Sequence, residues 1–253
     1  MLKRVLALIL ALLLASLALV GCKEETPTPT PDPDKPGSNM ETQGPTKLDG
    51  GALDGTLTWE LYSDGTLYIK GDGAMTELER GEGDSVIQPW YKYLGTDGGT
   101  AITKLVVESG VTSLASCAFM NCVKLREVTI SETVSEIPEK CFKYCEALTK
   151  VTAKGVTRIA DNAFDSCIKL STVTFSASLI FVGDGAFLRA GEEAKSFSVR
   201  LAGTAEEWAA AKAEMDADEN DELAVWTGNE KLLTGLESPA FVAKPTGTPN
   251  AEE

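Results

Sequence analysis

The sequence predicts a fold of the α/β class that is mostly β: a short solenoid whose repeats share one parallel sheet, between an N-terminal β-hairpin cap and a C-terminal helical cap. Three observations support this prediction. From residue 101 a set of apolar residues recurs at intervals of 22 or 23, a hairpin pattern precedes this array, and a helical pattern follows it. Such a period is typical of a solenoid, in which each repeat buries its apolar face only against its neighbours.

The repeat is clearest in a column of phenylalanines, each preceded by alanine or cysteine. The column consists of Phe119, Phe142, Phe164 and Phe187. Cysteine follows the first three phenylalanines at a distance of three residues, and leucine follows three residues after that. This Ala-Phe-x-x-Cys-x-x-Leu segment has helical spacing, so we expect a helical turn to close each repeat on the side opposite the sheet.

Each repeat also contains a short β-forming segment, for example residues 128–130. Segments of this kind are rich in β-branched residues, which favour strands, and stacking the repeats places these strands side by side in a parallel sheet. We expect the inward-facing residues of the strands to form the core together with the phenylalanine and cysteine columns. These strand residues are Leu105, Val128, Val151 and Val173. The solenoid is predicted to span residues 101–200.

Distinct patterns flank the repeats. The predicted N-terminal cap spans residues 49–100. In it, Leu57, Trp59 and Leu61 alternate with Thr58, Glu60 and Tyr62, a Ser-Asp-Gly turn follows, and residues 66–70 resume the strand pattern. In the predicted C-terminal cap, residues 201–238, residues 204–215 favour a helix that Thr204 caps. This helix is expected to cover the open end of the solenoid. Residues 239–253 are expected to be a disordered tail.

The amino terminus predicts export and lipid attachment. Lys3 and Arg4 precede an apolar run over residues 5–20, which is shorter than the roughly 20 residues that a spanning helix needs. The string Leu-Val-Gly-Cys at 19–22 matches the bacterial lipobox, so we predict a signal peptide at 1–21 and lipidation of Cys22. An ordinary signal peptide or a transmembrane anchor is the alternative. Residues 22–48 form a Pro/Thr-rich linker that favours polyproline II.

The charge balance limits the classes of partner. The formal net charge is −15, and an acidic protein repels both phosphate backbones and anionic lipids. We therefore predict no nucleic-acid partner. Membrane association is expected to depend on the lipid at Cys22, which leaves the protein membrane-anchored, extracytoplasmic and at the cell surface.

The repeat pattern L-x-x-V-T-I-x-x-x-V-x-x-I-x-x-x-A-F-x-x-C-x-x-L resembles the BspA-like, Treponema-type leucine-rich repeat over residues 101–190. The segment TLTWELYSDGTLYIKGDGAM followed by PWY is similar to the β-rich lead-in found before such repeats. GTAEEWAAAKAEM with GNEKLL is similar to a closing segment found after them. This resemblance implies a short leucine-rich-repeat solenoid in a surface-exposed interaction protein, in some cases an adhesin. Two positions depart from it: the third repeat is one residue short near Gly155, and Ala190 replaces a cysteine.

Catalytic and metal-binding patterns are largely absent from the sequence. It contains no histidine, which excludes His-based catalytic triads and His-ligated zinc. Ser166 and Lys169 match the S-x-x-K pattern of some serine acyl enzymes, but they fall in a repeat turn, where a surface position is the simpler interpretation. We predict no catalytic residue, no metal site and no cofactor.

One acidic segment resembles the start of an EF-hand loop, in which Asp216, Asp218 and Asn220 occupy alternate positions. Asp221 and Thr227 stand where calcium geometry requires Gly and Glu. We interpret the segment as a solvated acidic turn, and weak calcium binding stays open.

The cysteines other than Cys22 are interpreted as buried free thiols. They are Cys117, Cys122, Cys141, Cys145 and Cys167. An odd number cannot all pair within one chain. Three of them occupy one repeat column, where a small buried apolar residue suffices. A disulfide between two of the five and a metal site are the alternatives.

The outward face of the predicted sheet is the candidate binding face. One of its columns alternates in charge and is expected to form a cross-strand ladder worth about 0.2–1 kcal/mol per pair, and the next column is β-branched. Strand stability alone also explains both columns. The candidate residues are Lys104, Val106, Glu127, Thr129, Lys150, Thr152, Thr172 and Thr174.

Aromatic residues of the two caps are a second candidate, because such rings can stack on sugars. Core packing is the simpler use of these side chains. They are Trp59, Trp90, Tyr91, Trp208 and Trp226.

From these patterns we predict a non-catalytic, adhesin-like lipoprotein that presents its repeats to an extracellular protein or glycan. One alternative is an envelope scaffold that binds a partner of the same cell, and another is a carbohydrate-binding module that uses the cap aromatics. An enzyme is a third alternative, for which the sequence shows no recognisable carboxylate pair. Ligand identity, the type of membrane and the oligomeric state stay open.

Overall fold

The computed structural model describes residues 44–53, 55–79, 81, 87–95, 100–217 and 230–243. All of them belong to one unit, residues 43–253. The predicted signal peptide, Cys22 and most of the linker lie outside the described residues. Within the described part of the chain, no helix is both long enough and apolar enough to cross a membrane.

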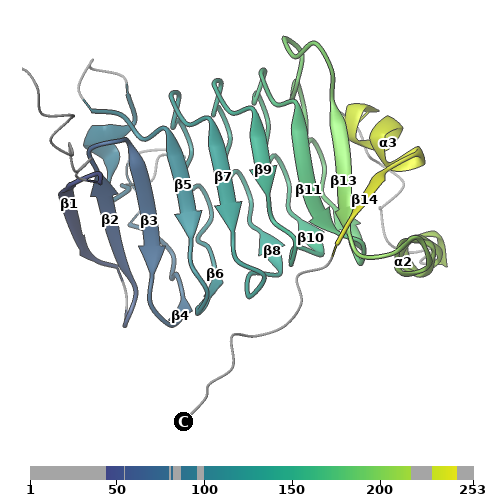
Figure 1. Ribbon diagram of the computed structural model, residues 1–253, viewed down its shortest axis with the longest axis horizontal. Helices are drawn as coiled ribbons and strands as arrows, with labels where there is room; N and C mark the ends of the chain where they lie inside the picture. Colours follow the sequence, from purple (N-terminus) through teal and green to yellow (C-terminus); the bar gives the residue numbers. More distant parts are fainter. Residues whose placement is uncertain are drawn as a thin grey trace, which may run out of the picture. The chain divides into compact units, whose positions relative to one another are not determined.

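The repeats stack into one parallel sheet, as the sequence predicts (Figure 1). Successive side chains of a strand point to opposite faces, so one set faces the core. The inward-facing strand residues Leu105, Val128, Val151 and Val173 are all buried. The strands of the repeats are β5 (Lys104–Val107), β7 (Glu127–Ile130), β9 (Lys150–Thr152), β11 (Thr172–Ser176) and β13 (Ser198–Ala202).

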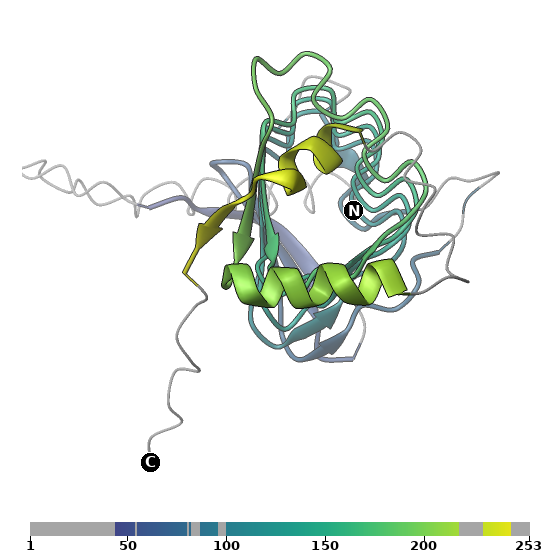
Figure 2. The same ribbon diagram turned by 90° about the vertical axis from the view of Figure 1, so that its right-hand side faces the viewer.

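A second, shorter strand follows in each of four repeats: β6 (Val111–Ser113), β8 (Glu136–Ile137), β10 (Arg158–Ile159) and β12 (Phe181–Val182). Strand β10 pairs in parallel with β8 and β12, so the repeats are linked along this side as well. Seen end-on, successive repeats lie over one another (Figure 2). The shortened third repeat makes its bend at Gly155, where an added Cβ would lie 2.3 Å from the carbonyl oxygen of Glu132. Only glycine fits this close approach.

The segments around the phenylalanines form turns, so the prediction of helical segments there was wrong. In the first repeat, the N–H of Met120 donates to a carbonyl three residues earlier, whereas the N–H groups of Phe119 and Asn121 donate to Cys141 and Lys143 of the next repeat, each at 2.9 Å. A helix directs every N–H along its own axis and cannot make these bonds between repeats. The left-handed φ of +64° at Asn121 turns the chain out of the helical path.

The core is a stack of aromatic rings beside a column of thiols. Ring centroids lie 5.2, 5.4, 5.3 and 5.1 Å apart along Trp90, Phe119, Phe142, Phe164 and Phe187. The five described cysteines are all buried and free, which confirms the prediction of buried thiols. Burial raises the pKa of the Cys141 and Cys145 thiols well above the usual value, so these groups stay protonated.

The N-terminal cap extends the same sheet. Strands β2 (Thr58–Tyr62) and β3 (Thr66–Lys70) form the predicted hairpin, whose turn contains Gly65 with a φ of +80°. Strand β1 (Lys47–Ala52) pairs antiparallel with β2, and β3 pairs in parallel with β5. The cap also contains β4 (Gly73–Ala74) and the 3-10 helix η1 (Tyr91–Tyr93). The hairpin therefore continues the sheet of the repeats toward the amino terminus.

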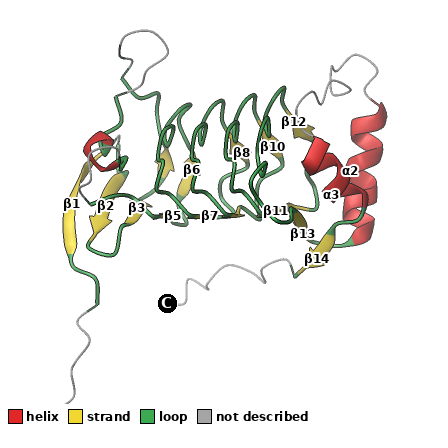
Figure 3. Ribbon diagram, turned by 90° about the horizontal axis from the view of Figure 1, so that it is seen from above, coloured by secondary structure: helices red, strands yellow, loops and turns green. Residues whose placement is uncertain are grey.

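The C-terminal cap contains the predicted helix, α2 (Ala205–Ala217), together with α3 (Glu230–Glu237). Thr204 and Glu207 form a capping box: the Thr204 hydroxyl accepts from the Glu207 N–H at 3.2 Å, and the Glu207 carboxylate accepts from the Thr204 N–H at 2.9 Å. Both helices lie at the C-terminal end of the repeats (Figures 2 and 3).

One segment of the expected disordered tail is ordered. Residues Ala240–Val242 form strand β14, which pairs in parallel with β13. The edge of β13 offers unpaired N–H and C=O groups, and a short strand satisfies them. The prediction of disorder was therefore wrong for these three residues.

Candidate binding face

The strand register brings the eight predicted face residues together in two columns. Each residue of the charged column is the register partner of the next one along the sheet, and the same holds for the β-branched column. The first column is Lys104, Glu127, Lys150 and Thr172; the second is Val106, Thr129, Thr152 and Thr174. We call this surface the repeat face.

Seven of the eight residues reach solvent, and the eighth does not. Lys104, Glu127, Thr129 and Lys150 are exposed, and Val106, Thr152 and Thr172 are half-buried. Thr174 is only 7 % exposed, so its assignment to the binding face was wrong. The sheet continues past Thr174 through β13 and β14. The register partner of Thr174 on β13 is Arg200, which has a long side chain.

The expected ladder of ion pairs along the charged column is absent. Although Lys104, Glu127 and Lys150 are register neighbours, none of them forms an ion pair with any described residue. Exposed ion pairs contribute only about 0–1 kcal/mol, which does not suffice to order three long side chains in water. Charge on the repeat face is therefore left to solvent or to a partner.

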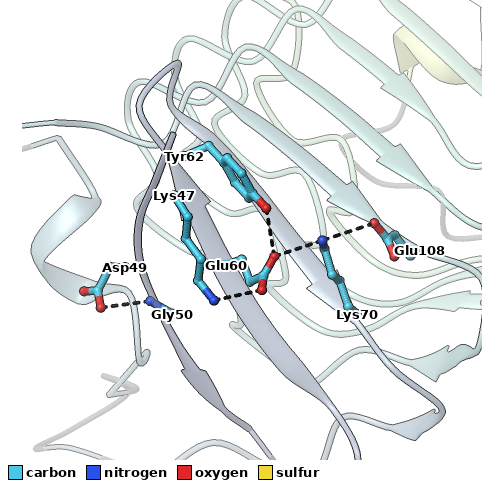
Figure 4. Close-up of polar contacts among 7 residues, drawn as sticks. All are labelled: Lys47, Asp49, Gly50, Glu60, Tyr62, Lys70 and Glu108. Atoms are coloured by element: carbon cyan, nitrogen blue, oxygen red, sulfur yellow. Dashed lines mark hydrogen bonds and ion pairs between the residues drawn. The ribbon is translucent and has the colours of Figure 1, made fainter. Parts of the chain in front are cut away.

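At the N-terminal end of the same sheet the charges are paired, in a cluster that the sequence analysis did not identify (Figure 4). The Glu60 carboxylate lies 2.8 Å from the Lys47 ammonium and 2.9 Å from that of Lys70, and it accepts a hydrogen bond from the Tyr62 hydroxyl at 3.1 Å. Lys70 also lies 3.8 Å from Glu108 at the end of β5. We call these five residues the cap network.

Electrostatics stabilise the charged forms in the cap network. Hydrogen bonds from Lys47 and Lys70 lower the pKa of the Glu60 carboxyl from 4.5 to about 2. The hydrogen bond to Glu60 in turn raises the pKa of Lys70. Tyr68, on β3 beside Val106, packs its ring under the Lys70 ammonium, which lies 4.8 Å from the ring centroid. The alternation of the hairpin could have shown that Glu60, Tyr68 and Lys70 face outward.

A second ion pair ties β1 to η1. The Asp49 carboxylate lies 2.8 Å from the Lys92 ammonium and accepts a hydrogen bond from the Tyr93 hydroxyl at 2.8 Å. Its backbone neighbour Gly50 also donates to it (Figure 4). The hydrogen bond from Lys92 contributes most to lowering the pKa of Asp49 to about 2. Both networks use the charges of the cap to fix its own elements.

The cap aromatics have two different environments. Trp59 and Trp90 are buried in the core, and Trp208 packs against it, as the core-packing interpretation predicts. Tyr91 is 63 % exposed, so core packing was wrong for this residue. Trp226 lies outside the described residues.

The candidate nucleophile Ser166 is in a repeat turn but is buried, in contrast to the surface position expected for it. Its hydroxyl donates to the Asp165 carboxylate at 2.9 Å, and that carboxylate pairs with Lys143 at 2.8 Å. The backbone N–H groups of Gly191 and Glu193 donate to the carbonyl groups of Cys167 and Ile168, directly after Ser166. Lys169 is exposed and forms no hydrogen bond with Ser166.

No group of three metal-ligating side chains occurs among the described residues, and in the EF-hand-like segment Asp216 belongs to α2 while its other members lie outside them. An open hollow of about 610 Å³ lies between α3 and residues 194–199, and it contains none of the predicted face residues.

A comparison with known protein families supports the repeat assignment. Residues 98–199 match six copies of the BspA type leucine rich repeat region. No curated protein matches the sequence. A leucine-rich repeat protein from Eubacterium ventriosum is similar at 23 % identity and a TM-score of 0.47, with 61 % of this chain and 44 % of that one covered. A leucine rich cell surface protein from Faecalibacterium prausnitzii is similar at 24 % identity and a TM-score of 0.36. The match covers 62 % of this chain and 42 % of that one.

The T. pallidum leucine rich repeat protein is similar at 21 % identity and a TM-score of 0.29, with 58 % of this chain and 69 % of that one covered. The matched part of this chain spans less than half of the first two solved chains. The repeat columns, the stacked parallel strands and the family match agree. Residues 98–199 of the chain are therefore a BspA-type leucine-rich repeat region.

Proposed function

We propose that this chain is a non-catalytic lipoprotein of the bacterial cell surface that binds a partner on its repeat face. The observation that supports this proposal best is that the charged residues of the repeat face are exposed and form no ion pairs with other described residues. Lys104, Glu127 and Lys150 project from adjacent strands into solvent, and none of them forms an ion pair within the described residues. Unpaired, regularly placed charges beside small hydroxyl side chains suit recognition by surface complementarity.

The non-catalytic part of the proposal is supported by the state of the reactive groups. Ser166 is buried and hydrogen-bonded, and the thiols of Cys141, Cys145 and Cys167 are buried with a raised pKa. A thiol acts as a nucleophile only as the thiolate, and burial disfavours that form. The chain also contains no histidine that could act as a general base.

The lipid anchor is supported by the amino-terminal pattern that ends at Cys22. A Cys22→Ser variant should lose lipid and move from the membrane fraction to the soluble exported fraction, as fractionation and mass spectrometry would show. Retention of Cys22→Ser in the membrane would contradict the anchor. Protease treatment of intact cells should cut the wild-type repeats if they face outward, whereas protection would favour a scaffold inside the envelope.

Binding is tested with the full chain on immobilised matrix proteins, mucins and glycans. A Thr129→Tyr/Thr152→Tyr variant keeps residues that favour strands and leaves the charge unchanged, but it fills the middle of the repeat face. Thr112→Tyr is the matched control, because Thr112 is exposed on β6, in a different sheet. The proposal predicts a ligand that the double variant loses and the control keeps. Equal binding by both variants would place the site elsewhere.

A further inference from the structure

We propose that the repeat face binds an extended acidic polypeptide segment, which crosses the strands and carries an acidic side chain at about every third residue. This inference rests on the proposed function and deepens it, because it names the chemistry of the partner. It follows from the sign, the spacing and the surroundings of the charges on strands β5 to β13.

The sign of the face differs from that of the chain. The formal net charge is −15, yet the charged residues of the repeat strands β5, β7, β9, β11 and β13 are three cations and one anion. They are Lys104, Lys150, Arg200 and Glu127, all exposed. None of the four forms an ion pair with another described residue. An acidic partner therefore gains Coulomb attraction here that the rest of the protein opposes.

The spacing of the cations suits one backbone conformation. Lys104 and Lys150 occupy one column and are separated by a single strand, β7. Neighbouring strands lie about 4.8 Å apart, so the two side chains leave the sheet roughly 9.6 Å apart. A polyproline II segment rises about 3.1 Å per residue with three residues per turn, which repeats one side of the ligand every ~9.3 Å. Acidic residues three positions apart therefore match the two lysines.

The anion between the lysines excludes denser ligands. Glu127 is the register partner of both Lys104 and Lys150. A ligand with negative charge at every residue would place one of its charges against Glu127 and be repelled. A ligand with two uncharged residues between its acids leaves that position neutral.

The neighbouring column provides partners for an extended backbone. A polyproline II segment makes no internal hydrogen bonds, so its carbonyl groups need external donors. Thr129 and Thr152 carry hydroxyl groups beside Glu127 and Lys150, and Val106 offers an apolar contact beside Lys104. The cap network adds no available cation, because Lys47 and Lys70 already pair with Glu60.

The test uses the full chain and a synthetic peptide of five Glu-Pro-Pro units, with affinity measured at low and at physiological salt. We expect saturable binding that weakens as salt rises. A Lys104→Gln/Lys150→Gln variant should bind at least about twofold more weakly, as the loss of two exposed ion pairs implies. Lys124→Gln/Lys169→Gln is the matched control, because both lysines are exposed and lie outside the strands. This control should bind as the wild type does.

Three results would overturn the inference: no binding of the peptide, equal binding by the Lys104/Lys150 variant, or binding of a fully sulfated glycan in place of the peptide. Failure of the inference is distinguishable from failure of the proposed function. Suppose that one of the matrix proteins, mucins or glycans binds the Lys104→Gln/Lys150→Gln variant but not the Thr129→Tyr/Thr152→Tyr variant. The repeat face then binds a partner of other chemistry. In that case only the acidic segment is excluded.

Discussion

The two halves of the sheet face use charge in different ways. In the N-terminal cap, Glu60 accepts from Lys47, Lys70 and Tyr62, and the elements of the cap are held to one another by these contacts. In the repeats, Lys104 and Glu127 are register neighbours on parallel strands and still form no ion pair with any described residue.

This difference in charge pairing follows from the other contacts that stabilise each region. The repeats are stabilised from inside by stacked rings and by hydrogen bonds between successive turns. The edge strand β1 has a neighbouring strand on one side only, and ion pairs at its surface supplement that contact. The charged residues of the repeat face take part in no such ion pair with any described residue, which leaves them available for recognition.

The largest expected effect comes from the core beneath the repeats. Phe142 is fully buried between Phe119 and Phe164, at ring distances of 5.4 and 5.3 Å. Phe142→Ala should lower the free energy of unfolding by about 3–5 kcal/mol, because it leaves a cavity in the stack. Thermal denaturation followed by circular dichroism measures this loss. Tyr144→Ala, at a 40 % exposed side chain of the same turn, is the control and should cost far less. An unchanged melting temperature for Phe142→Ala would contradict the repeat packing.

The next effect concerns the cap network. Glu60→Gln removes the carboxylate that Lys47 and Lys70 share, while the side chain keeps its size. We expect a loss of about 1 kcal/mol in urea unfolding at pH 7, since two partly exposed ion pairs contribute roughly 0.2–1 kcal/mol each. No loss of stability would mean that these contacts are not structural.

The same carboxylate predicts a pH dependence. The pKa of Glu60 is lowered from 4.5 to about 2 in the folded protein, so its contribution is present above pH 4.5 and is lost as pH falls toward 2. Because the side chain is about one-fifth exposed, this part of the loss should stay below about 1 kcal/mol. Between pH 6 and 3, the free energy of unfolding should fall less steeply with decreasing pH for Glu60→Gln than for the wild type. Parallel curves would show that Glu60 does not titrate with folding.

The smallest effect is expected on the repeat face. Glu127→Gln should change the free energy of unfolding by less than about 0.5 kcal/mol, because Glu127 has no ion pair to lose. Glu60→Gln removes the same charge, but from a residue that forms ion pairs. The difference between the two losses of stability, measured under the same conditions, therefore gives the contribution of the ion pairs. A loss as large as that of Glu60→Gln would show that the repeat charges also stabilise the fold.

Much of the fold was predictable because the repeat period determines which side chains face the core. The phenylalanine and cysteine columns, the hairpin and the helix after Thr204 all follow from local spacing. The turns did not follow, because apolar spacing of three or four residues suits both a helix and a chain of turns. Hydrogen bonds to the next repeat, such as that from Phe119 to Cys141, decide between the two.

The candidate site was predictable only in part. Alternation along the strands identified the outward columns, but the exposure of Thr174 depends on β13 and β14, whose pairing lies beyond the repeat pattern. The cap network depends on the register of β1 against β2, which shifts between Lys47 and Asp49. Such an irregularity has no signature in residue spacing, so the pairing of Lys47 with Glu60 could not be inferred.

The central claim is that the lysines of the repeat face, Lys104 and Lys150, are available, whereas those of the cap network are engaged. Acetylation of the full chain with a limiting reagent, followed by mass spectrometry, measures each lysine separately. Lys70 pairs with Glu60 and its pKa is raised, so it should react more slowly than the exposed Lys104 and Lys150. If Lys70 reacts at least as fast as Lys104 and Lys150, the division of charge between the two regions is wrong.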